Sequence, residues 1–187
     1  MTERNIVHLG HPVLRSPAEA VLPEQLSGKT FQSLIDDMVE AMREAGGVGL
    51  AAPQVGEALQ IFVYEVAGSE EAAEEDEIPL RVLVNPMVEP EVGELIYDWE
   101  GCLSIPGLRG LVPRHPQVRV HGLDREGRPQ SFVAAGFEAR IVQHEFDHLN
   151  GIVFLDRMRD LRSLTFEEEF ARYVATAPGP QERATVG

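Results

Sequence analysis

The five residues from His144 to His148 constrain this chain more than any other feature, because they indicate both a helix and a chemistry. Their sequence is His-Glu-Phe-Asp-His, within an apolar segment, 136–149, that predicts a helix. Residues four apart on a helix lie one above the other, so both imidazoles can bind the same metal ion. Glu145 lies about 100° around the helix from His144 and can reach a water that the metal activates. This pattern is typical of metal-assisted hydrolysis.

The same pattern also arises by chance on solvent-exposed helices, where the two histidines would be an ordinary i,i+4 pair. The flanking residues argue against exposure, because apolar side chains on several sides predict a helix buried nearly all round. These side chains are Phe137, Ile141, Val142, Phe146 and Leu149. Buried histidine and glutamate side chains need partners, since unpaired buried polar groups are costly. A metal ion would supply them.

A catalytic metal site needs a third protein ligand and one open position. Cys102 is the single cysteine of the chain, which excludes an internal disulfide, and a glycine that permits unusual backbone conformations precedes it. The rival is Glu168, at a spacing that suits a Glu-ligated zinc endopeptidase. However, Glu167, Glu168 and Glu169 together are typical of the solvated first turn of a helix. We therefore favour Cys102 as the third ligand.

The remaining pattern predicts an α+β fold. Helical periodicity covers 30–45, 136–149 and 165–174, and strand-like runs cover 59–66, 80–84, 92–99, 118–123 and 131–134, with a hairpin turn at 124–127. Small residues at 48–56 predict a tight, backbone-exposed segment. The strands do not alternate with helices as in βαβ units, so we expect mostly antiparallel sheets wrapped around the central helix that carries the motif, plus an N-terminal and a C-terminal helix.

Composition limits the organisation and the partners. A length of 187 residues with 43% hydrophobic and 25% charged residues predicts one catalytic domain, 1–176, followed by a disordered tail, 177–187. The formal charge of −15 disfavours direct nucleic-acid binding. The polar N-terminus and the absence of a long apolar run predict a cytoplasmic protein without a signal peptide or membrane span. An acidic insert at 68–78 is expected to be a solvated loop.

Three segments, in this order, resemble the signature motifs of one family, the peptide deformylases. They are Gly-Val-Gly-Leu-Ala-Ala-Pro-Gln at 47–54, Glu-Gly-Cys-Leu-Ser at 100–104 and Gln-His-Glu-Phe-Asp-His at 143–148. The resemblance covers roughly residues 6–158. It implies removal of the formyl group from the N-terminal formyl-methionine of nascent chains, with release of formate. It also implies the ligand set favoured above, namely Cys102, His144 and His148.

The resemblance implies roles for further residues. Glu145 would act as general base and then as general acid, while the side-chain amide of Gln54 and the backbone N–H of Leu103 would hold the oxyanion. The peptide would lie extended against the first motif, which leaves little selection beyond the first residue. The substrate-binding residues would be Gly47, Val48, Gly49, Phe137 and Ile141.

Val48, Phe137 and Ile141 are the candidates for an apolar methionine pocket, although each could equally be ordinary core, and Trp99 could form a further wall. Arg109 or Arg114 is expected to pair with Asp147 behind the metal helix.

A Cys-His-His set suits Zn(II), Fe(II), Ni(II) or Co(II). The resemblance favours Fe(II). The resemblance also implies that the enzyme comes transiently near the ribosome, although the acidic third helix argues against docking on ribosomal RNA. Two alternatives stay open from the residues, a Glu-ligated zinc endopeptidase and a non-catalytic binder of formylated N-termini.

Overall fold

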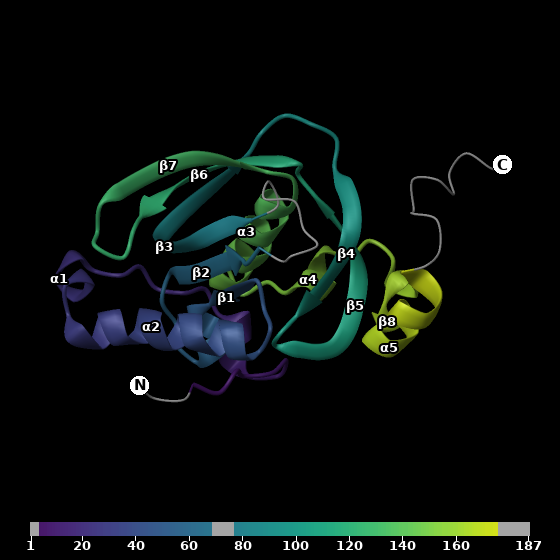
Figure 1. The fold of residues 1–187 in the computed structure, drawn as a ribbon, viewed down its shortest axis with the longest axis horizontal. Coiled ribbons are helices and arrows are strands. Elements are labelled where there is room, and N and C mark those ends of the chain that lie inside the picture. Colours follow the sequence, from purple (N-terminus) through teal and green to yellow (C-terminus); the bar gives the residue numbers. More distant parts are fainter. Residues whose placement is uncertain (1–3, 69–76, 176–187) are drawn as a thin grey trace.

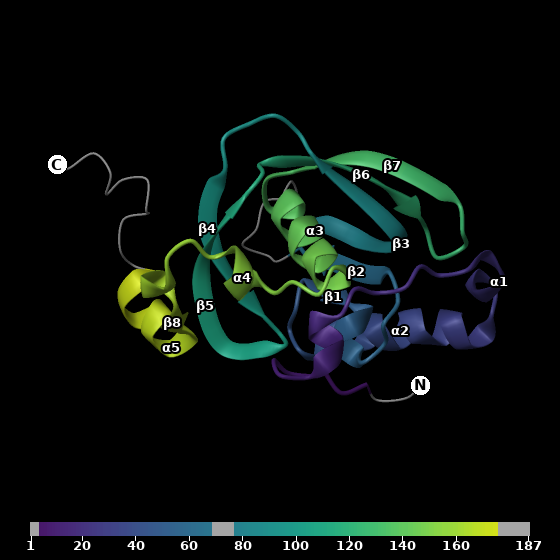
Figure 2. The same cartoon turned by 180° about the vertical axis from the view of Figure 1, so that it is seen from behind.

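The chain folds around one central helix, α3 (Gly136–Leu149), which is enclosed by two antiparallel sheets (Figure 1; Figure 2). The computed structural model describes residues 4–68 and 77–175. The sequence correctly predicts this α+β class and the bounds of the helix that carries the His-Glu-x-x-His motif. The predicted tail, 177–187, and most of the acidic insert, 68–78, fall outside the described residues.

The larger sheet has the strand order β1-β2-β3-β6-β7, and every neighbouring pair is antiparallel. β1 comes from the small-residue segment of the first motif and pairs only with β2 among the described strands. The backbone groups on the other edge of β1 therefore lack a strand partner within residues 4–68 and 77–175. The five strands, in chain order, are Gly49–Ala51, Ile61–Val66, Ile78–Pro90, Gln117–Leu123 and Pro129–Ala135.

The second strand, β2, is buried on both faces because a helix covers each of them. Ile61 and Val63 face the core built on α2 (Lys29–Glu44), whereas Phe62 and Tyr64 face the core built on α3. Successive side chains of a strand point to opposite faces, so one continuous apolar run supplies both cores. The helix α2 begins and ends one residue before the predicted 30–45.

The smaller sheet has the order β4-β5-β8 and packs beside α3. β4 (Ile96–Cys102) and β5 (Ile105–Arg114) form a hairpin in which Cys102 lies opposite Ile105. The sequence does not predict β5, because its prolines and glycines are typical of turns. One of these, Gly110, packs closely, since a Cβ there would lie 2.5 Å from the sulfur of Met158 and would displace that side chain.

The third predicted helix, 165–174, is only partly right. Thr165–Phe166 form strand β8, which pairs with Leu108 and Arg109 of β5. Helical structure starts two residues later, with α5 (Glu167–Glu169) and the π-helical turn η5 (Phe170–Val174). The sheet pairing overrides the local helical pattern and places this C-terminal segment along the free edge of β5.

Short turns that the sequence does not predict complete the fold. Gly151, with φ +71°, ends α3 as predicted, and α4 then packs against β5. The short elements are η1 (Pro12–Arg15), α1 (Pro23–Leu26), η2 (Ala52–Val55), α4 (Phe154–Arg157) and η4 (Leu161–Ser163).

No helix among the described residues is long and apolar enough to cross a membrane.

Candidate metal centre and active site

The structure brings one cysteine and two histidines together as a donor group able to hold a metal ion. The ligand-type atoms of Cys102, His144 and His148 all lie within 4.8 Å of one another. The distance from Cys102 Sγ to His148 Nε2 is 3.3 Å. Metal–sulfur and metal–nitrogen bonds of about 2.3 and 2.1 Å in a tetrahedral site would place such atoms about 3.6 Å apart. The donor spacing thus fits a small divalent cation.

The two histidines are prepared for metal binding in different ways. His144 has its Nδ1 2.9 Å from Glu100 Oε2, which leaves Nε2 free to face the donor group. His148 is fully buried, and burial lowers its pKa well below the ordinary value, so its ring is neutral. Neutral imidazole is the form that binds a metal.

Glu100 is the centre of a buried charge network that the sequence did not reveal. Its carboxylate accepts two hydrogen bonds from Arg114, at 2.9 and 3.0 Å, and one of 2.8 Å from Arg140. Burial alone would raise its pKa, but the hydrogen bonds from His144 and Arg114 hold that pKa well below the ordinary value. Arg140 lies four residues before His144, on the same face of α3, so this spacing was the signal available in the sequence.

Asp147 extends this network behind the metal helix. Arg114 Nη1 donates to Asp147 Oδ2 at 2.6 Å, which confirms one of the two predicted pairings. The other arginine, Arg109, instead pairs with Glu167. Arg157 also donates to Asp147, so α3 is fastened by two cations beside its last turn.

Glu145 is a buried carboxylate beside the donor group. It is 4% exposed, and its Oε2 atom has no hydrogen-bond partner among the described residues. Burial raises its pKa to about 7, which suits a group that takes and returns a proton near neutral pH. A Cβ at position 49 would lie 2.4 Å from Glu145 Oε1, so any side chain larger than that of Gly49 would displace the carboxylate.

Gln54 is held by both ends of its amide. Its Oε1 accepts from the backbone N–H of Ala51 at 2.8 Å, which fixes the amide so that Nε2 points to Ser104 Oγ at 3.3 Å and Cys102 Sγ at 3.5 Å. The N-terminal segment supports both loops, because Val7 N–H donates to Gln54 O and Leu9 N–H donates to Ser104 O, each at 2.8 Å. A rigid amide donor next to the metal donors suits a developing negative charge.

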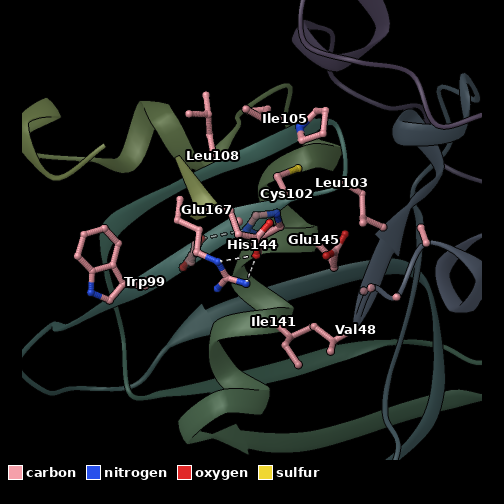
Figure 3. A pocket seen from close by; sticks show the side chains of 18 of the residues that line it. Val48, Trp99, Cys102, Leu103, Ile105, Leu108, Ile141, His144, Glu145 and Glu167 are labelled. Carbon is pink, nitrogen blue, oxygen red and sulfur yellow. Dashed lines mark hydrogen bonds and ion pairs between the residues drawn. The ribbon is translucent and has the colours of Figure 1, made fainter. Parts of the chain in front are cut away.

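These residues line a cavity of about 470 Å³. Figure 3 shows Cys102 and His144 between two walls, with Val48 and Leu103 on one side and Trp99, Leu108 and Glu167 on the other. All the predicted catalytic and substrate-binding residues line it, whereas His148 is fully buried and is not part of the lining. These residues are Gly47, Val48, Gly49, Gln54, Leu103, Phe137, Ile141 and Glu145.

The candidate methionine-pocket residues differ in burial. Ile141 is 4% exposed and also packs in the α3 core, whereas Phe137 is 53% exposed at the mouth of the cavity. Arg140, which the sequence analysis did not single out, also lines the cavity and is buried. Glu168 is exposed and belongs to no metal-donor group among the described residues, so the geometry favours Cys102 over this rival.

Comparison with known proteins gives one consistent result. The family model described as "Polypeptide deformylase" matches residues 3–163. The chain is 41% identical over 163 residues to peptide deformylase 1 of Nitrosomonas europaea, covering 87% of this chain and 92% of the relative. It is 43% identical over 165 residues to peptide deformylase 2 of Pseudomonas putida, covering 88% and 93%.

Comparison with solved structures also finds peptide deformylases. A crystal structure of the class I type b peptide deformylase from Acinetobacter baumannii with Met-Ala-Ser bound superposes with a TM-score of 0.77 at 36% identity. The match covers 84% of this chain and 100% of the other. An enzyme from Synechococcus elongatus in complex with actinonin superposes with a TM-score of 0.75 at 40% identity, covering 90% and 85%.

Proposed function

The chain belongs to the peptide deformylase family, metal-dependent hydrolases that remove the formyl group from nascent peptides, and we propose that it performs this reaction at the Cys102–His144–His148 centre. One observation carries the assignment. The three donor atoms converge within 4.8 Å beside Glu145, a buried carboxylate without a hydrogen-bond partner among the described residues. The donor set suits Fe(II), which the family resemblance favours, and also Zn(II), Ni(II) or Co(II).

The metal, when bound, supplies a water of near-neutral pKa and polarises the formyl oxygen. Glu145 takes the proton of the attacking water and delivers it to the nitrogen of the leaving peptide. Its buried position keeps this proton away from bulk solvent, and its pKa of about 7 lets it act in both directions. The products are formate and a peptide with a free N-terminal amine.

The Gln54 amide and the backbone N–H of Leu103 stabilise the oxyanion of the tetrahedral intermediate. The Ala51 hydrogen bond fixes which end of the Gln54 amide faces the metal donors, so the donor is oriented before substrate arrives. A donor of this kind typically contributes about 2.7–4 kcal/mol to transition-state stabilisation.

The substrate is bound through its backbone and its first side chain. The unpaired edge of β1, next to Gly47 and Val48, offers strand-like pairing to an extended peptide. The methionine side chain enters the apolar part of the cavity lined by Val48, Phe137 and Ile141. The relative from Acinetobacter baumannii binds Met-Ala-Ser, which has the sequence of a product of this reaction.

The test is formate release from formyl-Met-Ala-Ser by protein prepared without oxygen and loaded separately with Fe(II), Ni(II) and Zn(II). We expect Cys102→Ala to lose both metal and turnover, and Glu145→Ala to lose turnover while keeping metal. Glu168→Ala is the matched control for the endopeptidase alternative and should keep both. Metal retained by Cys102→Ala, or lost by Glu168→Ala, would contradict the ligand assignment. Peptide binding without turnover with any metal would leave a non-catalytic binder.

We further propose that residues 1–176 act as one catalytic domain in the cytoplasm and meet nascent chains close to the ribosome without binding its RNA. The net charge of −15 supports the absence of a stable RNA contact. Sedimentation of the protein with empty ribosomes at physiological salt tests this proposal, and stable co-sedimentation would contradict it.

A further inference from the structure

We propose that Glu167, on the C-terminal segment 165–174, forms a charge-selective subsite that favours basic over acidic side chains just after the formyl-methionine. This inference rests on the proposed binding of the peptide in the cavity described above. It concerns the wall opposite β1, where Trp99, Leu108 and Glu167 lie (Figure 3).

The segment is held on this wall by three kinds of contact. Strand β8 pairs with β5, placing Phe166 opposite Leu108, so Glu167 follows directly at the cavity. The ring of Phe170 lies edge-on to Trp99, with ring centres 5.0 Å apart. The same ring lies under the guanidinium of Arg109, 5.3 Å from its centre. These contacts therefore fix the segment as part of the cavity wall.

The charge of this wall is set by a single ion pair. Arg109 Nε and Nη2 both donate to Oε1 of Glu167, at 3.0 and 2.8 Å. The guanidinium is thus already engaged, and its side chain is 36% exposed against 55% for Glu167. The second carboxylate oxygen, Oε2, takes no part in either bond. The more accessible partner at the mouth is therefore the carboxylate.

The other charged groups that line the cavity do not offset this carboxylate. Glu100 and Arg140 are buried and paired with each other, and Glu145 lies at the reacting end of the cavity. The formyl group must reach Cys102 and Glu145, so the residues that follow the methionine extend toward the mouth. A lysine or arginine there meets Glu167, whereas an aspartate or glutamate is repelled by it.

The experiment compares kcat/KM for three C-terminally amidated peptides, formyl-Met-Ala-Lys, formyl-Met-Ala-Glu and formyl-Met-Ala-Ala. We expect the lysine peptide to exceed the glutamate peptide by about two- to five-fold in low salt, the range of exposed charge pairs. In 0.5 M salt the ratio should approach one, because screening then acts within roughly 5 Å. Formyl-Met-Lys-Ala and formyl-Met-Glu-Ala, also amidated, report the neighbouring position.

Two substitutions should move the ratio in opposite directions. Glu167→Gln removes the carboxylate and releases Arg109, so the preference for lysine should vanish or reverse. Arg109→Gln leaves the carboxylate unopposed, so the preference should grow. Glu168→Gln is the matched control, because it changes the net charge equally one residue away but does not line the cavity. It should keep the wild-type ratio.

The subsite is refuted if the wild-type enzyme has the same kcat/KM for the lysine and glutamate peptides in low salt. It is also refuted if Glu167→Gln and Glu168→Gln shift the ratio equally, since that result would reflect the overall charge of −15 rather than a local contact. Absence of turnover on the alanine peptide would contradict the catalytic assignment itself and the subsite with it. The two failures are therefore distinguishable.

Discussion

Replacing Gly49 with alanine should lower the catalytic rate strongly while leaving the stability of the fold nearly unchanged. The new Cβ would lie 2.4 Å from Glu145 Oε1, 2.9 Å from Cδ and 3.0 Å from Cγ, whereas ordinary contact begins at 3.4 Å. The carboxylate must therefore retreat by about 1 Å. A misplacement of about 1 Å in a catalytic group can cost roughly 100-fold in rate, which corresponds to about 2.7 kcal/mol of transition-state stabilisation.

The fold itself should tolerate the change. The φ angle of Gly49 is not positive, so alanine can adopt the backbone conformation. Reduced freedom of the unfolded chain favours alanine by about 0.4–1 kcal/mol, which offsets part of the local strain. We expect a thermal midpoint within about 4 °C of wild type, with metal content unchanged, because the three atoms nearest to the new methyl group all belong to Glu145, which is not a metal ligand.

The assay is kcat for formate release, with metal content and thermal unfolding measured on the same preparation. Gly93→Ala is the control, since its Cβ would meet only Pro116, at the ordinary contact distance of 3.4 Å. A Gly49→Ala enzyme that keeps more than about a third of wild-type kcat would show that Glu145 need not stay where the structure places it. The inference that Gly49 fixes the catalytic position of Glu145 would then be refuted, whereas the proton-carrier role itself is tested by Glu145→Ala.

Three further changes probe other parts of the site. Gln54→Ala should lower kcat by about 100- to 1000-fold with metal retained, because it removes one oxyanion donor. Glu100→Gln should weaken metal binding about 10- to 100-fold in chelator competition. It should also destabilise the fold by about 3–5 kcal/mol in urea, because buried arginines lose their countercharge. Phe137→Ala should raise the KM for formyl-Met-Ala-Ala more than Ile141→Ala does. Ile141→Ala should instead destabilise the fold by about 2–5 kcal/mol, because Ile141 is buried core.

Each of these has an outcome that contradicts it. Metal loss in Gln54→Ala would mean that the amide supports the metal rather than the oxyanion. Unchanged chelator sensitivity in Glu100→Gln would show that the carboxylate does not orient His144. A stable Ile141→Ala protein with impaired methionine binding would place that side chain in the pocket rather than in the core.

The parts of the fold that sequence predicts well are those specified locally. Helices α2 and α3 follow from apolar periodicity, and the histidine pair follows from i,i+4 spacing within α3. Strand β5 escapes prediction because its prolines and glycines are locally typical of turns, and the packing of Gly110 against the distant Met158 is recorded by no local pattern. The start of the C-terminal helix is displaced for a similar reason, since Thr165 pairs with β5.

The same division holds within the site. Cys102 could be chosen from its sequence context, but the role of Glu100 depends on a strand bringing it to three residues far along the chain. Glu167 looked like one acid among three, and only the register of β8 distinguishes it from Glu168. Long-range strand pairing, rather than composition, decides which of several similar side chains reaches the cavity.

The amino-terminal stretch supports both loops of the oxyanion site, since it is hydrogen-bonded to Gln54 in one loop and to Ser104, next to Leu103, in the other. Val7 and Leu9 hold Gln54 and Ser104 through two backbone hydrogen bonds, although these loops are about fifty residues apart in the chain. Terminal segments are usually the first to fray on warming. Fraying here would release both loops together, so activity should fade in a pre-transition below the melting of the core, in step with amide exchange at Val7 and Leu9.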